Sequence, residues 1–223
     1  MNKVLVEAII EHFKENIYNN VSGEVATEGG GKFDYEVRYD RYEAVVRGED
    51  AHRIVIHEDG GKDYLLENKE YMFCGRHRSY NFNDTDLDAY DYDTKEELEE
   101  AIKERYKGAT ILPLYMYEHS GIALSTTPFS CSWDSGRLGF VIMTKEMAQD
   151  RGLETKEQIE EAIRNGVEYW NKVESETYWY VGYEIATICK CCERDGEFKE
   201  SENISCFQDE MTKDVVNLIA DQD

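Results

Sequence analysis

Two kinds of hydrophobic periodicity mark the first part of the chain. The first is an apolar stripe that recurs every four positions and predicts an amphipathic helix ending near residue 20. It consists of Leu5, Ile9, Phe13 and Ile17. In the second, apolar and polar residues alternate strictly from residue 33 to 40 and again through 42, 44 and 46. This alternation predicts strands with one solvated face.

Further signals predict a hairpin and another helix. The apolar runs 54–56 and 64–66 flank an Asp-Gly-Gly sequence at 59–61. Because glycine supplies the positive φ that tight turns need, we expect two strands joined by a turn there. Thr94 and Glu97 form a capping-box pattern ahead of an apolar stripe. This pattern predicts a helix from about 94 to 107.

The middle and end of the chain complete an α+β pattern. The runs 112–117 and 138–143 predict a central strand pair, 176–189 and 204–207 predict further strands, and 215–219 predicts a short helix or strand. We therefore expect an antiparallel sheet with a few packed helices and an N-terminal helix. We expect residues 1–68 to form one region of helix and antiparallel strands, and residues 69–223 to form an α+β core region. No linker rich in Pro, Gly or Ser separates them, so we expect both to pack as one domain.

One helix start occurs twice. TKEELEEAI at 94–102 and TKEQIEEAI at 155–163 share seven of nine residues. An internal duplication would explain the match, but so would convergence, since acids near a helix N-terminus interact favourably with the helix dipole. The sequence leaves both explanations open.

Charge and composition restrict the class of protein. The 223 residues include 48 Asp and Glu against 25 Lys and Arg, a net charge of −23, with 41% hydrophobic residues. Such a chain can bury a core and carries a strong negative field, whereas a direct nucleic-acid binder normally has the opposite sign. The six unevenly spaced cysteines predict reduced thiols in a cytoplasm. Glu7 interrupts the first apolar segment, and the longest apolar run, 111–117, is too short to span a membrane.

Several motifs resemble a family of uncharacterised proteins encoded by bacteriophages and related mobile elements. They are CGRHRSYN at 74–81, LPLYMYEHSG at 112–121, FSCSWDSGRLGF at 129–140, ETYWYVGYE at 176–184 and SCF at 205–207. The resemblance runs from about residue 70 to 207 and implies a setting, phage infection of a bacterium, but no activity. The extra thiols at 189–192 depart from the family pattern.

The most reactive residue types lie between residues 119 and 135. His119, Cys131 and Asp134 are the types of a base, a thiol nucleophile and an orienting acid. A structural interpretation competes with catalysis: Cys131 packs as a small hydrophobe, Trp133 fills the core, and 134–136 form a turn. We favour the structural interpretation because free cysteines are usually buried and inert.

A metal site is the second chemical candidate. Two sets of ligands are candidates: Cys74, His77, His119, Cys131 and Cys206 form the first, and Cys189, Cys191 and Cys192 with Cys206 form the second. Neither set shows the two paired C-x-x-C knuckles that mark a zinc site, and a strand through 189–192 would turn Cys192 away from Cys189 and Cys191. No P-loop, G-x-G-x-x-G, H-E-x-x-H or EF-hand pattern is present. We therefore expect no metal or other cofactor.

The acid-rich segment after residue 83 is the leading candidate for a binding surface. Its acids are Asp84, Asp86, Asp88, Asp91, Asp93, Glu96, Glu97 and Glu100. On a strand, alternate carboxylates would lie about 6.6–6.8 Å apart, close to the rise of two nucleotides along one DNA strand. Such a row would imitate a phosphate backbone, although acidity also simply keeps a protein soluble.

These observations predict an accessory protein of the infected cell's cytoplasm rather than an enzyme. It would bind and inhibit a host defence or nucleic-acid-processing protein through a basic groove, with nucleic-acid mimicry as one mode. It would contact neither nucleic acid nor membrane directly. A homodimer suits the aromatic content, although the net charge of −23 opposes it. The alternative is a Cys/His-dependent enzyme or a thiol-based ligand-binding protein centred on residues 119–135.

Overall fold

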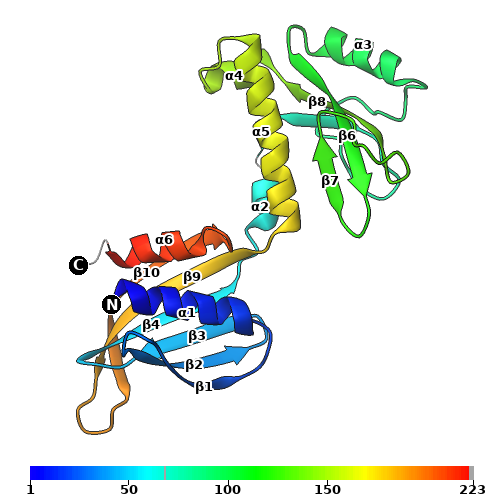
Figure 1. Ribbon diagram of the computed structural model, residues 1–223. Helices are drawn as coiled ribbons and strands as arrows, with labels where there is room; N and C mark the ends of the chain where they lie inside the picture. Colours follow the sequence, from blue (N-terminus) through cyan, green and yellow to red (C-terminus); the bar gives the residue numbers. More distant parts are fainter. Residues whose placement is uncertain (68, 221–223) are drawn as a thin grey trace. The chain divides into compact units, whose positions relative to one another are not determined.

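The computed structural model, which describes residues 1–67 and 69–220, confirms the α+β class. Within the described residues the strands form two antiparallel sheets, and the chain begins with a helix. The chain divides into two compact units (Figure 1). The terminal unit combines Met1–Gly61 with Glu176–Asp223, and the central unit is Lys62–Ser175. None of the described helices has both the length and the apolar character needed to cross a bilayer.

In its described residues the terminal unit is a six-stranded sheet with two helices. Its elements are α1 (Lys3–Asn16), β1 (Ser22–Ala26), β2 (Lys32–Arg38), β3 (Arg41–Val46), β4 (Asp50–Glu58), β9 (Tyr178–Ile188), β10 (Asp195–Phe207) and α6 (Met211–Ala220). The strand order is β1-β2-β3-β4-β9-β10. Strand β9 therefore lies between β4 and β10, and it joins the two ends of the chain in one sheet.

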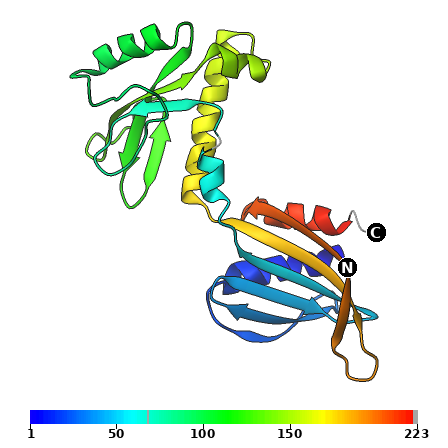
Figure 2. The ribbon, with the colours of Figure 1, turned by 180° about the vertical axis from the view of Figure 1, so that it is seen from behind.

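Both helices of the terminal unit pack on the same face of its sheet. The predicted stripe of α1 is buried at Leu5, Ile9 and Phe13. The ring of Phe13 lies 5.0 Å from that of Trp179 on β9, and Met211 of α6 joins the same core. Seen from behind, the sheet lies in front of α1 (Figure 2). The helices thus cover the apolar face that the strand alternation creates.

The central unit is a four-stranded sheet with four helices in its described residues. Its elements are α2 (Lys62–Glu67), β5 (Met72–Gly75), α3 (Lys95–Arg105), β6 (Thr110–Glu118), β7 (Ile122–Ser125), β8 (Ser135–Met143), α4 (Lys145–Asp150) and α5 (Lys156–Ser175). The strand order is β5-β8-β6-β7. The predicted central strand pair is confirmed, with Leu112 opposite Val141.

Helices cover both faces of this second sheet. Phe73 and Val141 pack in one cluster with the apolar side of α5, whereas Cys74 and Phe140 pack in another with Leu98 of α3. Neighbouring residues on a strand point to opposite faces, so β5 and β8 contribute to both clusters. This arrangement places α3, and the acid-rich segment that precedes it, on the face of the sheet opposite α5.

Two predictions about the first third of the chain differ from the structure. Residues 64–66 lie in helix α2 instead of forming the second strand of a hairpin, because β4 pairs with β9. The predicted division into 1–68 and 69–223 also differs from the observed units. Residues 176–220 belong with the N-terminal strands, since Ile54 on β4 lies opposite Tyr183 on β9.

Candidate functional site

The acid-rich segment between β5 and α3 is an irregular loop. Residues 84–94 contain no strand, so the expected row of carboxylates at strand spacing is wrong. Asp88 shows why: its Oδ1 accepts a hydrogen bond from Tyr90 N at 2.9 Å, and its carbonyl accepts one from Asp91 N at 3.0 Å. Short acidic side chains that bind nearby backbone amides favour turns over a sheet ladder.

The first two acids of this loop hold it to the fold. Asp84 Oδ1 lies 2.9 Å from Lys69 Nζ, and its Oδ2 accepts a hydrogen bond from Phe73 N at 2.7 Å. Asp86 Oδ2 lies 2.6 Å from Arg105 Nη2 at the end of α3. The hydrogen bonds from Arg105 lower the pKa of Asp86. Both carboxylates therefore have structural partners within the central unit.

Helix α3 begins with the predicted capping box. Thr94 Oγ1 accepts a hydrogen bond from Glu97 N at 3.1 Å, and Glu97 Oε2 accepts one from Thr94 N at 3.2 Å. Leu98 and Ile102 are buried against the sheet. The cap and the buried stripe together fix which side of α3 faces solvent.

The remaining carboxylates form what we call the α3 acidic surface. They are exposed on the loop and on the solvent side of the helix: Asp88, Asp91, Asp93, Glu96, Glu97, Glu100 and Glu104. The lysines of the helix neutralise these carboxylates only in part. Lys103 pairs with Glu99 and Glu100, and Lys95 donates to the carbonyl of Leu138 at 2.7 Å. This surface is strongly negative.

The three candidate catalytic residues are only partly brought together. His119 Nδ1 lies 3.6 Å from Asp134 Oδ2, where β6 meets the loop before β8. Cys131 is half-buried, and its carbonyl accepts a hydrogen bond from the Ser135 hydroxyl. Within the described residues its thiol makes no hydrogen bond to His119. The geometry therefore pairs a base, His119, with an orienting acid, Asp134, but it does not bond the nucleophile Cys131 to that base.

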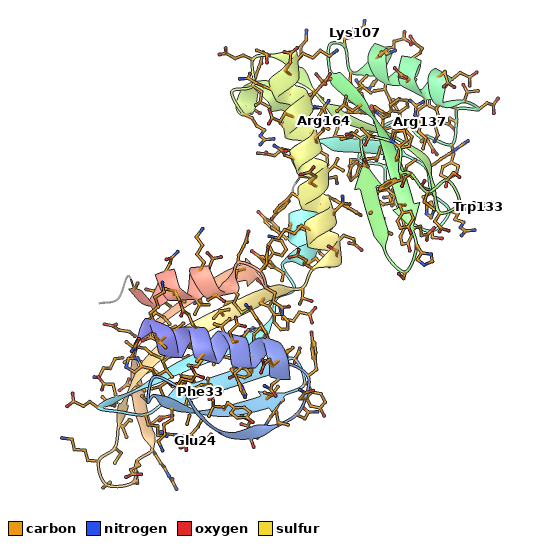
Figure 3. All side chains as sticks on the ribbon, in the orientation of Figure 1. Glu24, Phe33, Lys107, Trp133, Arg137 and Arg164 are labelled. Carbon is orange, nitrogen blue, oxygen red and sulfur yellow. The ribbon has the colours of Figure 1, made fainter. Side chains whose placement is uncertain are left out.

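Trp133 lies on the surface, contrary to the interpretation that it fills the core. Its side chain is 94% exposed, on the loop that joins β7 to β8, and points outward from the central unit (Figure 3). Strand β8 begins only at Ser135, so the sheet provides no apolar cover for this side chain. The F-S-C-S-W-D sequence alone gave no signal that separates a buried from an exposed tryptophan.

A shallow pocket of about 380 Å³ lies beside Trp133 in the central unit. Its lining combines Arg76, Arg78 and Arg137 with the carboxylates of Glu118 and Asp134. Arg137 Nη2 lies 3.6 Å from Glu99, and its Nη1 lies 3.8 Å from Glu96. The pocket therefore borders the α3 acidic surface, and Arg137 connects the two.

Cys74, His77 and Cys206 do not form a common metal site in the described residues. Cys74 is buried and accepts a hydrogen bond from Thr85 Oγ1 at 3.4 Å, while His77 Nε2 lies 3.5 Å from Glu118 Oε2. Cys206 is buried in the terminal unit, and burial raises the pKa of its thiol to about 12. Cys74 and Cys206 therefore act as packing residues.

Three thiols of the second candidate set do converge, without Cys206. Cys189, Cys191 and Cys192 have sulfur atoms that all lie within 4.8 Å of one another. In a strand, Cys192 would point away from Cys189 and Cys191. It does not, because residues 189–194 form the turn between β9 and β10. Hydrogen bonds from Cys191 and Cys192 lower the pKa of Cys189 to about 6.

Comparison of the chain with models of protein families, with curated proteins and with solved structures finds no significant match. Its function is therefore argued from the side chains themselves.

Proposed function

We propose that this chain is a non-enzymatic, phage-encoded accessory protein that binds and inhibits a host defence or nucleic-acid-processing protein. The observation that carries the proposal is the α3 acidic surface, a group of exposed carboxylates on one capped helix and its preceding loop. A basic groove is its electrostatic complement, and opposite charges speed association. The phage setting comes from the motif resemblance between residues 70 and 207.

The proposed mimicry is one of charge and not of spacing. The carboxylates follow a loop and a helix, so they do not repeat at the interval of DNA phosphates. They still offer a dense negative field to lysines and arginines that otherwise neutralise nucleic acid. Inhibition then follows because the chain and the nucleic acid compete for one groove.

Trp133 supplies the anchor that a charged surface lacks. Tryptophan is strongly enriched among the residues that dominate binding energy at interfaces. Here the indole is 94% exposed and lines the pocket that Arg137 connects to Glu96 and Glu99. A partner that covers α3 and inserts beside Trp133 would gain both electrostatic attraction and buried apolar area. The proposed interface therefore contains the α3 acidic surface and Trp133.

The test is affinity capture from lysate of a bacterial host, performed at low and at high salt. We expect a nucleic-acid-binding protein to be retained at low salt, released by added salt, and displaced by duplex DNA. The decisive variant removes four carboxylates through Asp91→Asn, Asp93→Asn, Glu96→Gln and Glu100→Gln. It spares Asp84, Asp86, Asp88 and Glu97, which stabilise the loop and the cap.

A matched control removes the same charge elsewhere, through Glu28→Gln, Glu197→Gln, Glu200→Gln and Glu202→Gln. These residues are exposed and belong to the terminal unit. Loss of capture in the α3 variant alone supports the proposal. Equal loss in both variants would show that only net charge matters, and capture that DNA does not displace would contradict competition for a groove. Cys131→Ser should leave capture unchanged, since the proposed interface uses no thiol chemistry.

A further inference from the structure

The turn between β9 and β10 has a compact hydrogen-bonded form. Glu193 N donates to the carbonyl of Cys189 at 2.8 Å, which closes one helical turn, and Cys189 N donates to the carbonyl of Arg194 at 2.9 Å. Glu193 then adopts a φ of +54°, which ends the turn and returns the chain into β10. A helical turn brings residues i and i+3 to the same side, so Cys189 and Cys192 become neighbours.

The sulfur atoms are close enough to share one ion. Those of Cys189 and Cys191 lie 2.9 Å apart, and all three lie within 4.8 Å of one another. Three sulfurs bound to one ion at about 2.3 Å would be separated by roughly 3.8–4.0 Å. Small side-chain rotations would convert the observed cluster into such a site.

The base of the turn is held in place by the sheet. Asp195 Oδ1 lies 2.7 Å from Arg47 Nη1, and its Oδ2 lies 2.8 Å from Arg53 Nη2. Arg47 Nη1 also donates a hydrogen bond to the carbonyl of Glu193. At Gly196 an added Cβ would lie 2.5 Å from Thr187 Oγ1, so glycine permits the close approach of the two strands. A turn anchored in this way would bind an ion with little ordering cost.

Packing does not account for these cysteines. Cys191 and Cys192 are exposed and Cys189 is half-buried, whereas Cys74 and Cys206 are buried in the cores. The cluster also contains no carboxylate, which Mg²⁺ and Ca²⁺ would require. Thiolates select soft or borderline ions such as Cu⁺ and Zn²⁺.

We propose that Cys189, Cys191 and Cys192 bind one thiophilic closed-shell metal ion at the tip of the β9–β10 hairpin. Cu⁺ would be satisfied by the three sulfurs. Zn²⁺ would take a water molecule as its fourth ligand. This site is independent of the proposed inhibitory function, because it uses other residues, in the terminal unit.

The test titrates the full-length, fully reduced protein with Cu⁺ and, separately, with Zn²⁺, each in competition with a coloured chelator. Titrations are performed without oxygen and with excess Mg²⁺, which occupies weak carboxylate sites. We expect one equivalent of Cu⁺ or Zn²⁺ to be retained. The variant that combines Cys189→Ser, Cys191→Ser and Cys192→Ser should lose that equivalent, and Cys131→Ser should keep it.

Circular dichroism of the triple variant checks that the fold persists, which we expect because the turn is at the surface. If the triple variant retains either ion as tightly as the unmodified protein, the ligands lie elsewhere and the proposal is wrong. Failure of the unmodified protein to retain either ion would also overturn it. Partner capture measured on the triple variant keeps the two proposals distinguishable, since loss of the metal should leave capture unchanged.

Discussion

The close approach of β5 and β8 at Gly139 gives a sharp test of the central unit's fold. Gly139 on β8 lies opposite Gly75 on β5. A Cβ added at Gly139 would lie 2.2 Å from the carbonyl oxygen of Cys74 and 2.5 Å from the Cα of Gly75. The first distance is about 1.2 Å short of the 3.4 Å at which ordinary contact begins. Both obstacles are backbone atoms, so rotation of a side chain cannot remove them.

Gly139→Ala should therefore separate β5 from β8. Adjacent strands lie about 4.7–4.9 Å apart, and widening this spacing by about 1 Å breaks the local backbone hydrogen bonds. Overpacking of this kind typically costs about 1–3 kcal/mol, and each lost hydrogen bond adds about 0.5–1.5 kcal/mol. We expect the free energy of unfolding of the central unit to fall by about 2–4 kcal/mol, a large share of a typical domain's stability.

The assay is urea denaturation followed by circular dichroism, together with hydrogen exchange of peptides that contain β5 and β8. Gly136→Ala is the matched control, because it lies on the same strand and has no atom within 4 Å of the added Cβ. A Gly139→Ala protein as stable as the control, with unchanged exchange in β5, would refute the close approach of the two strands.

Three further outcomes follow from the helix cap, from the half-buried His12 and from the buried Cys206. Thr94→Ala should lower the stability of the central unit by about 1 kcal/mol and speed hydrogen exchange at the start of α3, because Glu97 N loses its acceptor. Burial lowers the pKa of His12, which contacts the Tyr42 hydroxyl, so the unfolded chain binds a proton more readily. Neutral His12 therefore contributes stability above the unfolded pKa of about 6.5, and this contribution is lost as the pH falls below that value. In urea denaturation, the free energy of unfolding of His12→Gln should decrease less toward pH 5 than that of the unmodified protein. With a pKa of about 12, Cys206 should resist alkylation at pH 8 until denaturant is added, as measured by mass spectrometry.

Local patterns were sufficient to predict many of the individual elements. The four-residue stripe through Phe13 predicted α1, and the Thr94–Glu97 capping box predicted α3. The repeated start at Thr155 likewise begins α5, where the Thr155 hydroxyl accepts a hydrogen bond from Gln158 N at 3.2 Å. In each case the signal and the structure involve residues within one or two helical turns, which a single sequence records directly.

Pairing between distant segments could not be predicted in the same way. The apolar residues at 64–66 looked like a partner for 54–56, but Ile56 pairs with Val181. Both candidate partners are apolar, and strand alternation specifies a face without specifying a neighbour. The chain therefore enters the central unit after β4 and returns to the terminal unit at β9. No linker-like composition at either point indicated this arrangement.

The candidate sites were only partly predictable for the same reason, because contacts outside the local sequence pattern decide their structure. A period of two among Asp84, Asp86 and Asp88 suggested a strand, yet their carboxylates accept hydrogen bonds from side chains and backbone amides and so form a loop. A strand through the C-x-C-C sequence at 189–192 would have turned Cys192 away from Cys189 and Cys191, but these residues form a turn. This helical turn is set by backbone hydrogen bonds and by anchors at Asp195, which lie outside the motif.

The loop geometry of the acids implies a division of labour that kinetics can measure. Because the carboxylates do not repeat at phosphate spacing, the α3 acidic surface should act mainly at long range, where only the sum of charges matters. Neutralising Asp91, Asp93, Glu96 and Glu100 should then slow association and flatten its salt dependence, with a smaller effect on dissociation.

Trp133 acts only once the surfaces touch, so Trp133→Ala should accelerate dissociation by about tenfold or more and leave the salt dependence of association unchanged. Surface plasmon resonance with the captured partner separates the two rates. If Trp133→Ala dissociates at the unmodified rate while the acid variant does not bind, the tryptophan lies outside the interface. The charged helix alone would then account for recognition.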